Sequence, residues 1–434
     1  MKGNSRLQRF ASFGMMVVLA LTLAACGEAH PNTTFDPHSD YGRSIDFLWN
    51  RLLLLGTIVF VLVEAGLIYI MFRYRKREGD ERPPQTHGNV VVEIIWTLIP
   101  AFILLFIAVP TVRTVFKTQA KAVAGALQIE VIGHQWWWEF RYPEYGIITA
   151  NEIYLPTGRT VNFKLNSIDV IHSFWIPQLG GKRDVITNRT NYIWLTPDSS
   201  LKPAEWNGFC TEYCGTSHAK MRFRVFTVKP DQFASWVANQ KRPAEFGAVA
   251  PAPGAPPPGT SPVPATNPAA LPPAPSMGAA IAANAVNSSV PASPAYTFPI
   301  NQPEFEYAKP HTPVPAGMTF TAGLTGNAHR GQQVFSSSAC IGCHAIAGNP
   351  MAVGNVGPNL THFGSRATIG AGSFPNTPAY LALWIKNARV MKPGILMPTL
   401  GKDQFDPVIK SKVTVGGLDD QQIADIVAYL SALK

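Results

Sequence analysis

Two long apolar segments limit the fold of this chain more than any other feature. Segments 48–72 and 90–109 are each long enough to cross the hydrocarbon core of a bilayer, which takes about 20 apolar residues. The loop between them, 73–82, reads R-Y-R-K-R-E-G-D-E-R, and short basic loops of this kind stay on the cytoplasmic side. The pair therefore predicts a membrane hairpin, with everything after about Arg113 on the opposite, extracytoplasmic side.

The first 26 residues have the pattern of a secretory signal peptide. A basic start precedes a short apolar core, 10–23. The run L-A-A-C that ends at Cys26 resembles a bacterial lipoprotein box, in which this cysteine would become the lipidated first residue of the mature chain. The alternative is an ordinary cleaved signal in which the cysteine is incidental.

Composition narrows the classes of function. The 434 residues suffice for two or three domains, and a hydrophobic share of 46% with only 15% charged residues agrees with membrane segments. The net charge of +9 is scattered rather than gathered in a basic stripe with interleaved aromatic residues, so nucleic-acid binding is not expected. Each of the five cysteines has a predicted role, which leaves none for a disulfide framework.

The pattern of the chain changes twice after the hairpin. From Gln128 to Val228, short alternating apolar runs separated by turn residues predict a β-sandwich or Greek-key barrel. Residues 241–323 are dominated by Pro, Ala, Gly and Ser and predict a disordered linker. A second compact domain, 324–434, ends in a segment with apolar residues at helical spacing.

A dense set of soft ligands lies in the predicted sandwich. Between Cys210 and Met221 the chain reads C-T-E-Y-C-G-T-S-H-A-K-M, and upstream D-V-I-H-S-F-W-I-P offers His172 at the end of a strand. Thiolate and thioether ligands together favour copper over hard cations such as magnesium. The alternatives are a structural zinc site or a disulfide between the two cysteines.

This set closely resembles the binuclear CuA centre of subunit II of haem-copper cytochrome c oxidases. The resemblance implies an all-β, cupredoxin-like sandwich over 116–240, after a membrane part over 27–115 that follows the signal at 1–26. It also implies six copper ligands, counting the backbone carbonyl of the glutamate: His172, Cys210, Glu212, Cys214, His218 and Met221.

The C-terminal domain carries the c-type haem attachment motif. Cys340, Cys343 and His344 form C-I-G-C-H, in which both thiols bind the porphyrin and the histidine lies under the iron. The alternatives are a thioredoxin-like pair or a zinc knuckle. The G-P-N-L that follows resembles class I cytochromes c, which implies an all-α domain with the Pro358 carbonyl orienting the axial histidine.

The resemblance also assigns roles to single residues. The sixth iron ligand is expected to be Met397, which precedes a proline, whereas Met391 is expected to pack in the core. Trp136, in the block H-Q-W-W-W, is expected to be where electrons enter the copper centre, against the alternative that it only packs. Trp138 of the same block is expected to be buried.

Two carboxylates have weaker assignments. Glu93 lies at the start of the second membrane segment, where an acidic residue can simply face water at the interface; its match to the family segment implies the mouth of a proton channel into subunit I. The Glu212 carboxylate is expected to reach a Mg²⁺ shared with subunit I.

The whole chain resembles a subunit II fused to a cytochrome c, the caa3-type arrangement. The resemblance implies an inner-membrane subunit of a cytochrome c oxidase that passes electrons from haem c to CuA and on to haem a. Oxygen reduction, coupled to proton pumping, is then expected on subunit I, which holds haem a, haem a3 and CuB. Subunit III, membrane lipid and an external cytochrome c are the other expected partners. A nitric oxide reductase subunit and a membrane-anchored electron carrier are the alternatives, and a quinol-oxidase subunit is disfavoured because those lack the copper ligands.

Overall fold

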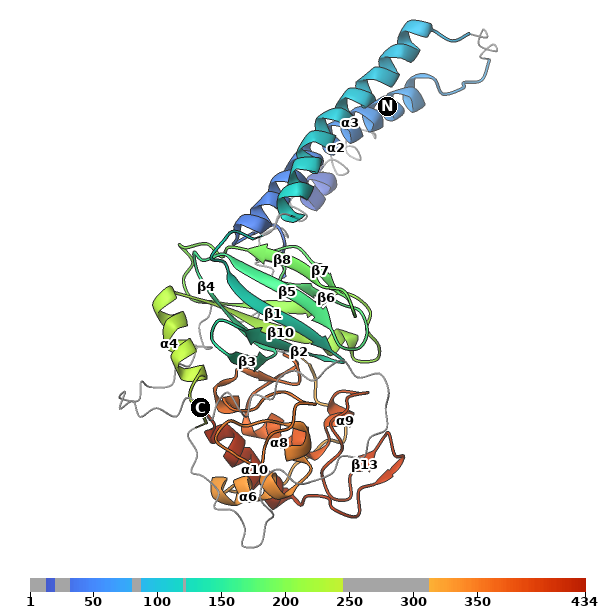
Figure 1. Cartoon of the computed structure of the whole chain (residues 1–434). Coiled ribbons are helices and arrows are strands. Elements are labelled where there is room, and N and C mark those ends of the chain that lie inside the picture. The colour runs from blue at the N-terminus through green and yellow to red at the C-terminus, as the bar shows by residue number, and fades with distance from the viewer. Residues whose placement is uncertain (1–12, 20–31, 80–86, 120–121, 245–311) are drawn as a thin grey trace.

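The computed structural model describes residues 13–19, 32–79, 87–119, 122–244 and 312–434. In these ranges the chain forms a helical hairpin, a β-sandwich and a helical domain, which lie one after another along the molecule (Figure 1). Cys26 and most of the predicted linker lie outside the described residues. The architecture agrees with the predicted fold class: a two-helix hairpin, an all-β domain and an all-α domain.

The hairpin consists of α2 (Asp40–Arg73) and α3 (Val90–Gln119). Both helices are long and apolar enough to cross a membrane, and they run side by side away from the sandwich (Figure 1). Ser39 caps α2 because its hydroxyl accepts the backbone N–H of Gly42 at 2.9 Å. The Asp40 carboxylate accepts the backbone N–H of Thr196 at 2.8 Å, which ties the N-terminal end of α2 to the sandwich.

The sandwich has two five-stranded sheets. Their orders are β3-β2-β1-β5-β8 and β4-β10-β9-β6-β7, with β1–β5 and β4–β10 parallel. The ten strands are β1 (Leu127–His134), β2 (Trp137–Tyr142), β3 (Ile147–Ala150), β4 (Glu152–Pro156), β5 (Val161–Ser167), β6 (His172–Trp175), β7 (Arg183–Val185), β8 (Asn191–Leu195), β9 (Ala204–Cys210) and β10 (Arg222–Val228).

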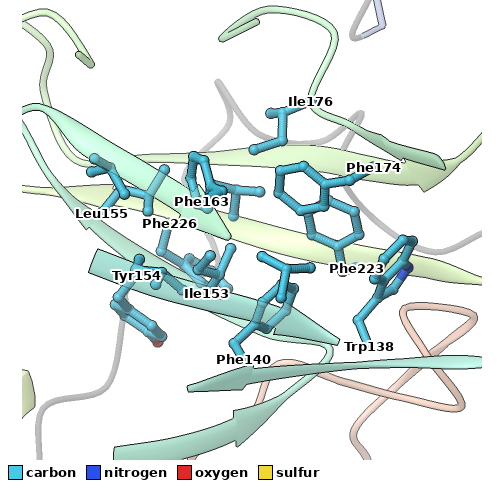
Figure 2. Packing of buried hydrophobic residues seen from close by; sticks show 14 of the residues in the cluster. Trp138, Phe140, Ile153, Tyr154, Leu155, Phe163, Phe174, Ile176, Phe223 and Phe226 are labelled. Carbon is cyan, nitrogen blue, oxygen red and sulfur yellow. The ribbon is translucent and has the colours of Figure 1, made fainter. Parts of the chain in front are cut away.

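Aromatic side chains fill the space between the sheets (Figure 2). Along β5 buried residues alternate with half-buried ones, the two-residue period of a strand with one face in the core. The rings of Phe174 and Phe223 stack at 4.9 Å between centroids, and Trp138 packs edge-on against both. Trp138 is fully buried, as the sequence predicted. Helix α4 (Pro230–Gln240) closes the sandwich, and its Trp236 stacks on Tyr154 at 4.7 Å.

The helical domain is built around two crossing helices, α6 (Ala328–Ser337) and α10 (Asp420–Ala432). They approach so closely that a Cβ on Gly331 would lie 1.9 Å from the backbone oxygen of Asp425, so only glycine fits there. Asp419 caps α10 through the backbone N–H of Gln422 at 2.8 Å. The remaining elements are α7 (Cys340–Cys343), η4 (Phe363–Ser365), β11 (Thr368–Ile369), β12 (Phe374–Pro375), α8 (Pro378–Lys386), α9 (Ala388–Met391), β13 (Phe405–Asp406) and β14 (Ser411–Lys412).

The core of the helical domain extends beyond its predicted start at residue 324. Val314, Met318 and Phe320 pack against the core, although the sequence assigned them to the linker. Ala244 packs on the same core, and its backbone N–H binds the Ala347 carbonyl at 2.8 Å. The described residues on both sides of 245–311 therefore rest on the helical domain.

The helical domain lies against the end of the sandwich that is far from the membrane helices (Figure 1). Ala388 and Ile395 of the helical domain belong to the apolar cluster of the sandwich, and Trp384 and Met397 pack against that cluster. The contact between the two domains is therefore a continuation of the sandwich core.

Candidate metal centres

Strand ends and one loop bring the predicted copper ligands together. His172 begins β6, Cys210 ends β9, and Met221 immediately precedes β10. Cys214 and His218 lie in the loop from β9 to β10, where a short 3₁₀ helix, η2 (His218–Lys220), turns the chain back. Because β9 pairs with both β6 and β10, the sheet itself holds these ends side by side.

The ligand atoms form a compact cluster. The sulfurs of Cys210 and Cys214 are 3.8 Å apart; His172 Nδ1 lies 3.8 Å from the first sulfur and His218 Nδ1 lies 3.6 Å from the second. Met221 Sδ lies 3.8 Å from the Cys214 sulfur. The Glu212 carbonyl oxygen lies 3.3 Å from the Cys210 sulfur. Each of the other four predicted donors therefore lies next to one of the two sulfurs, and the two cysteines are free thiols rather than a disulfide.

The protonation of the two thiols fits a cationic occupant. The hydrogen bond with Cys214 lowers the pKa of Cys210 well below its usual range, and the same bond raises the pKa of Cys214. Without a cation the pair therefore keeps one proton between its sulfurs. Thiolates are the metal-binding form of cysteine, so a bound metal has to displace that proton. Two thiolates, two imidazoles, a thioether and a carbonyl suit copper better than a hard cation.

A residue that the sequence analysis missed orients one of the imidazoles. Asp169 Oδ1 lies 2.8 Å from His172 Nε2, which leaves Nδ1 turned toward Cys210. Asp169 also accepts the backbone N–H of Gln135 at 2.6 Å, so it is fixed by the neighbouring hairpin. Although burial opposes it, contact with Asp169 raises the pKa of His172. The sequence held a signal for this role, because Asp169 lies three residues before His172 and carboxylates often orient metal-binding histidines.

Trp136 lies directly against the copper loop, which is the loop from β9 to β10 that carries Cys214 and His218. Its indole N–H donates to the Cys214 carbonyl at 2.8 Å, and the Gln135 side-chain amide donates to the same oxygen at 2.7 Å. Trp136 is only 8% exposed. The neighbouring Trp137 differs, because its ring stacks on His134 at 3.9 Å between centroids.

The haem motif opens into a cavity in the helical domain. Cys340 and Cys343 stand on α7, and His344 follows the helix; all three line the cavity, together with Phe335, Leu381, Ile385, Met397 and Leu430. His344 Nδ1 lies 2.8 Å from the Pro358 carbonyl, the contact that the sequence predicted. Burial lowers the pKa of His344, which favours the neutral imidazole that binds iron. An apolar cavity with two thiols and one oriented imidazole fits a covalently bound haem.

The methionines of the domain occupy different surroundings. Met397 lines the cavity, whereas Met391 is fully buried in the core of the helical domain. Met351 is exposed near the domain surface. This arrangement agrees with the prediction that Met391 packs, and it leaves Met397 as the methionine that faces the cavity.

The two centres share one wall. Gln135, Trp136 and Trp137 of the sandwich line the cavity in the helical domain. Trp136 therefore contacts the haem cavity on one side and the backbone of a copper ligand on the other. This juxtaposition needs both domains.

The two weaker sites lie on the protein surface. The Glu212 side chain is exposed on the copper loop, although its carbonyl faces the sulfur cluster. Glu93 is exposed in the first turn of α3.

Three family models match the chain. They are described as the cytochrome c oxidase subunit II transmembrane domain over residues 35–114, the periplasmic domain of the same subunit over 146–228, and cytochrome c over 328–434.

Individual relatives agree with the family models. Cytochrome c oxidase subunit 2 of Bacillus sp. (strain PS3) is 31% identical over 100% of this chain and 99% of its own length. The corresponding protein of Alkalihalophilus pseudofirmus is 28% identical over 96% of this chain and 95% of its own length. The solved periplasmic domain of subunit II of a Bradyrhizobium japonicum cytochrome oxidase is 30% identical, with a TM-score of 0.26; the match covers 28% of this chain and 96% of that domain.

Proposed function

This chain belongs to the cytochrome c oxidase subunit II family and carries a cytochrome c domain, and we propose which of its residues hold the redox centres and join them. It is an electron-transfer subunit of a cytochrome c oxidase and works in a complex with subunit I. Its periplasmic domain implies CuA and its C-terminal domain implies haem c. When bound, these groups supply reversible one-electron redox chemistry. Family membership favours this function over a nitric oxide reductase subunit or a free carrier.

We assign the copper ligands to the cluster that ends β9 and precedes β10. The ligands are His172, Cys210, Cys214, His218, Met221 and the carbonyl of Glu212. Spacings of 3.3–3.8 Å between these donors support the assignment. Asp169 holds His172 with its Nδ1 toward the sulfurs. A rigid site changes little in geometry when its charge changes, which is what an electron relay needs.

We assign covalent haem attachment to Cys340 and Cys343, and axial ligation to His344 and Met397. The Pro358 carbonyl keeps the histidine ring in one orientation and favours the neutral tautomer with Nε2 free. The mostly apolar cavity wall limits the access of water to the group that it encloses, although the cavity is open near Leu396. Exclusion of water is one of the means by which a protein sets the potential of such a group.

One observation carries the proposed link between the centres. Trp136 lines the haem cavity and donates a hydrogen bond at 2.8 Å to the carbonyl of the copper ligand Cys214. We therefore assign Trp136 as the residue through which electrons reach the copper centre. Its indole forms part of the haem cavity wall and is hydrogen-bonded to the backbone of a copper-ligating residue, so one side chain spans the distance between the two sites.

The remaining assignments extend to the partners. The protein is a membrane protein with two transmembrane helices and a periplasmic domain. We propose that the exposed Glu212 carboxylate binds Mg²⁺ at the contact with subunit I, since carboxylate and water suit this ion. We propose that Glu93 opens a proton path into subunit I, and that subunit III and an external cytochrome c are further partners. Lipidation of Cys26 would add an anchor in the same bacterial inner membrane.

Spectra of the intact oxidase complex test these assignments. Substituting Met221→Leu or His218→Ala is expected to alter the copper electron paramagnetic resonance signal and leave the haem c absorbance unchanged. Met351→Leu, at an exposed methionine, is the matched control. A copper signal that stays identical in both ligand variants would remove the assignment.

A further inference from the structure

The sandwich contributes a buried carboxylate to the contact between the domains. Glu152 begins β4 and is 4% exposed. Its Oε1 accepts the backbone N–H groups of Ala367 and Thr368 at 2.8 and 2.9 Å, and the Thr368 hydroxyl at 3.2 Å. Among the described residues, every hydrogen bond recorded for this carboxylate therefore comes from the helical domain.

The helical domain contributes a buried ammonium group in return. Lys392 follows α9 and is 2% exposed. Its Nζ donates to the carbonyl of Trp136 at 2.6 Å and to the carbonyl of Gly370 at 3.1 Å. Trp136 thus makes two contacts: its indole N–H donates to the loop that carries Cys214, and its backbone carbonyl accepts a hydrogen bond from Lys392 of the helical domain.

The chain next to Lys392 covers the Trp136 ring. Gly394 has a φ of +88°, and a Cβ there would lie 2.7 Å from Cη2 of Trp136. A residue with a side chain could not approach the indole this closely. The cavity nevertheless stays accessible elsewhere, because Leu396, which also lines it, is 72% exposed.

The burial of these two groups depends on the contact between the domains. Removing a charged or strongly polar group from water is costly unless hydrogen bonds replace the lost water. Those hydrogen bonds come from the opposite domain for Glu152 and in part for Lys392. Both groups would return to water if the domains separated. A displaced contact that kept them buried would lose their hydrogen bonds, so the pair favours the aligned contact over a displaced one.

We propose that Glu152 and Lys392, which we call the positioning pair, fix the position of the haem c domain over Trp136. This tryptophan is then covered and receives electrons from the chain's own haem domain. The proposal rests on the proposed function, since it presumes that Trp136 joins the two centres. An external protein donor then meets the haem cavity at its exposed rim, near Leu396, and does not touch Trp136. The pair positions the domains, and Lys392 does so from the wall of the haem cavity.

The test uses the intact oxidase complex. Haem c is reduced by a light pulse, and its reoxidation by the copper centre is followed by absorbance. Each hydrogen bond across the contact that is lost, leaving its partner buried and unpaired, shifts the aligned fraction by about tenfold or more. Lys392→Met and Glu152→Ala are therefore expected to slow reoxidation by about tenfold or more, while Glu152→Gln, which keeps an acceptor oxygen, recovers most of the rate. Lys412→Met and Glu144→Gln, at exposed residues away from the contact, are the controls.

The spectra separate the two levels of the proposal. If haem c and copper signals are normal and Lys392→Met and Glu152→Ala react at the unsubstituted rate, the positioning role is wrong. If the unsubstituted complex lacks either signal, the proposed function fails first. Hydrogen exchange on the unsubstituted complex guards against variants that do not fold: the Ala367 and Thr368 amides are expected to be protected, and their rapid exchange would overturn the proposal.

Discussion

The indole nitrogen of Trp136 lies 2.8 Å from the carbonyl oxygen of Cys214, and the same tryptophan forms part of the haem cavity wall. One side chain therefore contacts the surroundings of both centres. The arrangement depends on two separate contacts: the β1–β2 hairpin places Trp136 against the loop from β9 to β10, and the helical domain covers its ring. Each contact can be tested by itself.

Replacing Trp136 is expected to slow the transfer without changing either centre. Trp136→Phe removes the hydrogen bond to Cys214 but keeps an aromatic ring in the wall. Reoxidation of haem c should slow by about tenfold, the cost of roughly 1.4 kcal/mol in the barrier. Trp137→Phe is the matched control, because Trp137 lines the same cavity but stacks on His134. Equal rates in the two variants would contradict the assignment of Trp136.

Loss of the carboxylate behind His172 is expected to weaken copper binding. Asp169→Asn keeps the shape of the side chain but removes the charge that orients the imidazole through Nε2. Outer partners of metal-ligating histidines typically contribute 10–100-fold to metal affinity, so a loss of about that size is expected in a competition with a copper chelator. Asp231→Asn, at an exposed residue in the first turn of α4, is the control. Unchanged copper retention in Asp169→Asn would show that the contact does not support the site.

The two methionines after α8 are expected to respond in opposite ways. Met397→Leu removes the sulfur that faces the haem cavity and should replace the low-spin haem c spectrum with that of a site lacking its sixth ligand. Met391→Leu conserves volume in the core, so it should cost less than about 1.5 kcal/mol of stability and leave the spectrum unchanged. Optical and magnetic spectra of both variants distinguish them, and the reverse pattern would exchange their roles.

Alignment of the domains is expected to depend on pH in two separate windows. Burial raises the pKa of Glu152 from 4.5 to about 7, so the aligned state holds a proton that the separated state releases. Alignment therefore weakens as pH rises from about 4.5 to about 7. Burial lowers the pKa of Lys392 from 10.5 to about 7, so the aligned state releases its proton first, and alignment strengthens as pH rises from about 7 to about 10.

The same rate measurement checks this pH dependence. The haem c reoxidation rate is expected to fall across the acid window and rise across the alkaline one. Glu152→Gln should abolish the fall in rate across the acid window, and Lys392→Met should abolish the rise in rate across the alkaline window. The charged and titratable groups around them are Arg224, Glu205 and Arg366 near Glu152, and Cys214, Lys220 and Arg222 near Lys392. If the fall in rate persists in Glu152→Gln, or the rise in rate persists in Lys392→Met, the pH dependence would belong to one of these neighbours instead.

Local patterns in the sequence predicted the parts of this molecule but not their assembly. The alternation in T-V-N-F-K-L-N predicted β5, and the spacing of C-I-G-C-H predicted a haem site, because each signal lies within a few residues. Met391 and Met397 could be ranked for the same reason. These signals depend on local geometry alone.

The contact between the domains left no such signal. Glu152 binds residues about 215 positions later, and Lys392 binds Trp136 across 256 positions. Read alone, each is an ordinary charged residue, and charged residues are mostly exposed. Their burial results from tertiary packing, which periodicity and spacing do not encode. Asp169 is intermediate: its position three residues before His172 was visible, but its role required the fold.

Copper analysis of the purified oxidase complex, combined with its electron paramagnetic resonance spectrum, is the decisive test of whether the cluster around Cys210 and Cys214 holds copper. We expect a mixed-valence binuclear copper signal that disappears in a Cys210→Ser variant while haem c absorbance remains. Material that is folded and carries haem c but contains no copper, or that has zinc or a Cys210–Cys214 disulfide in its place, would contradict it.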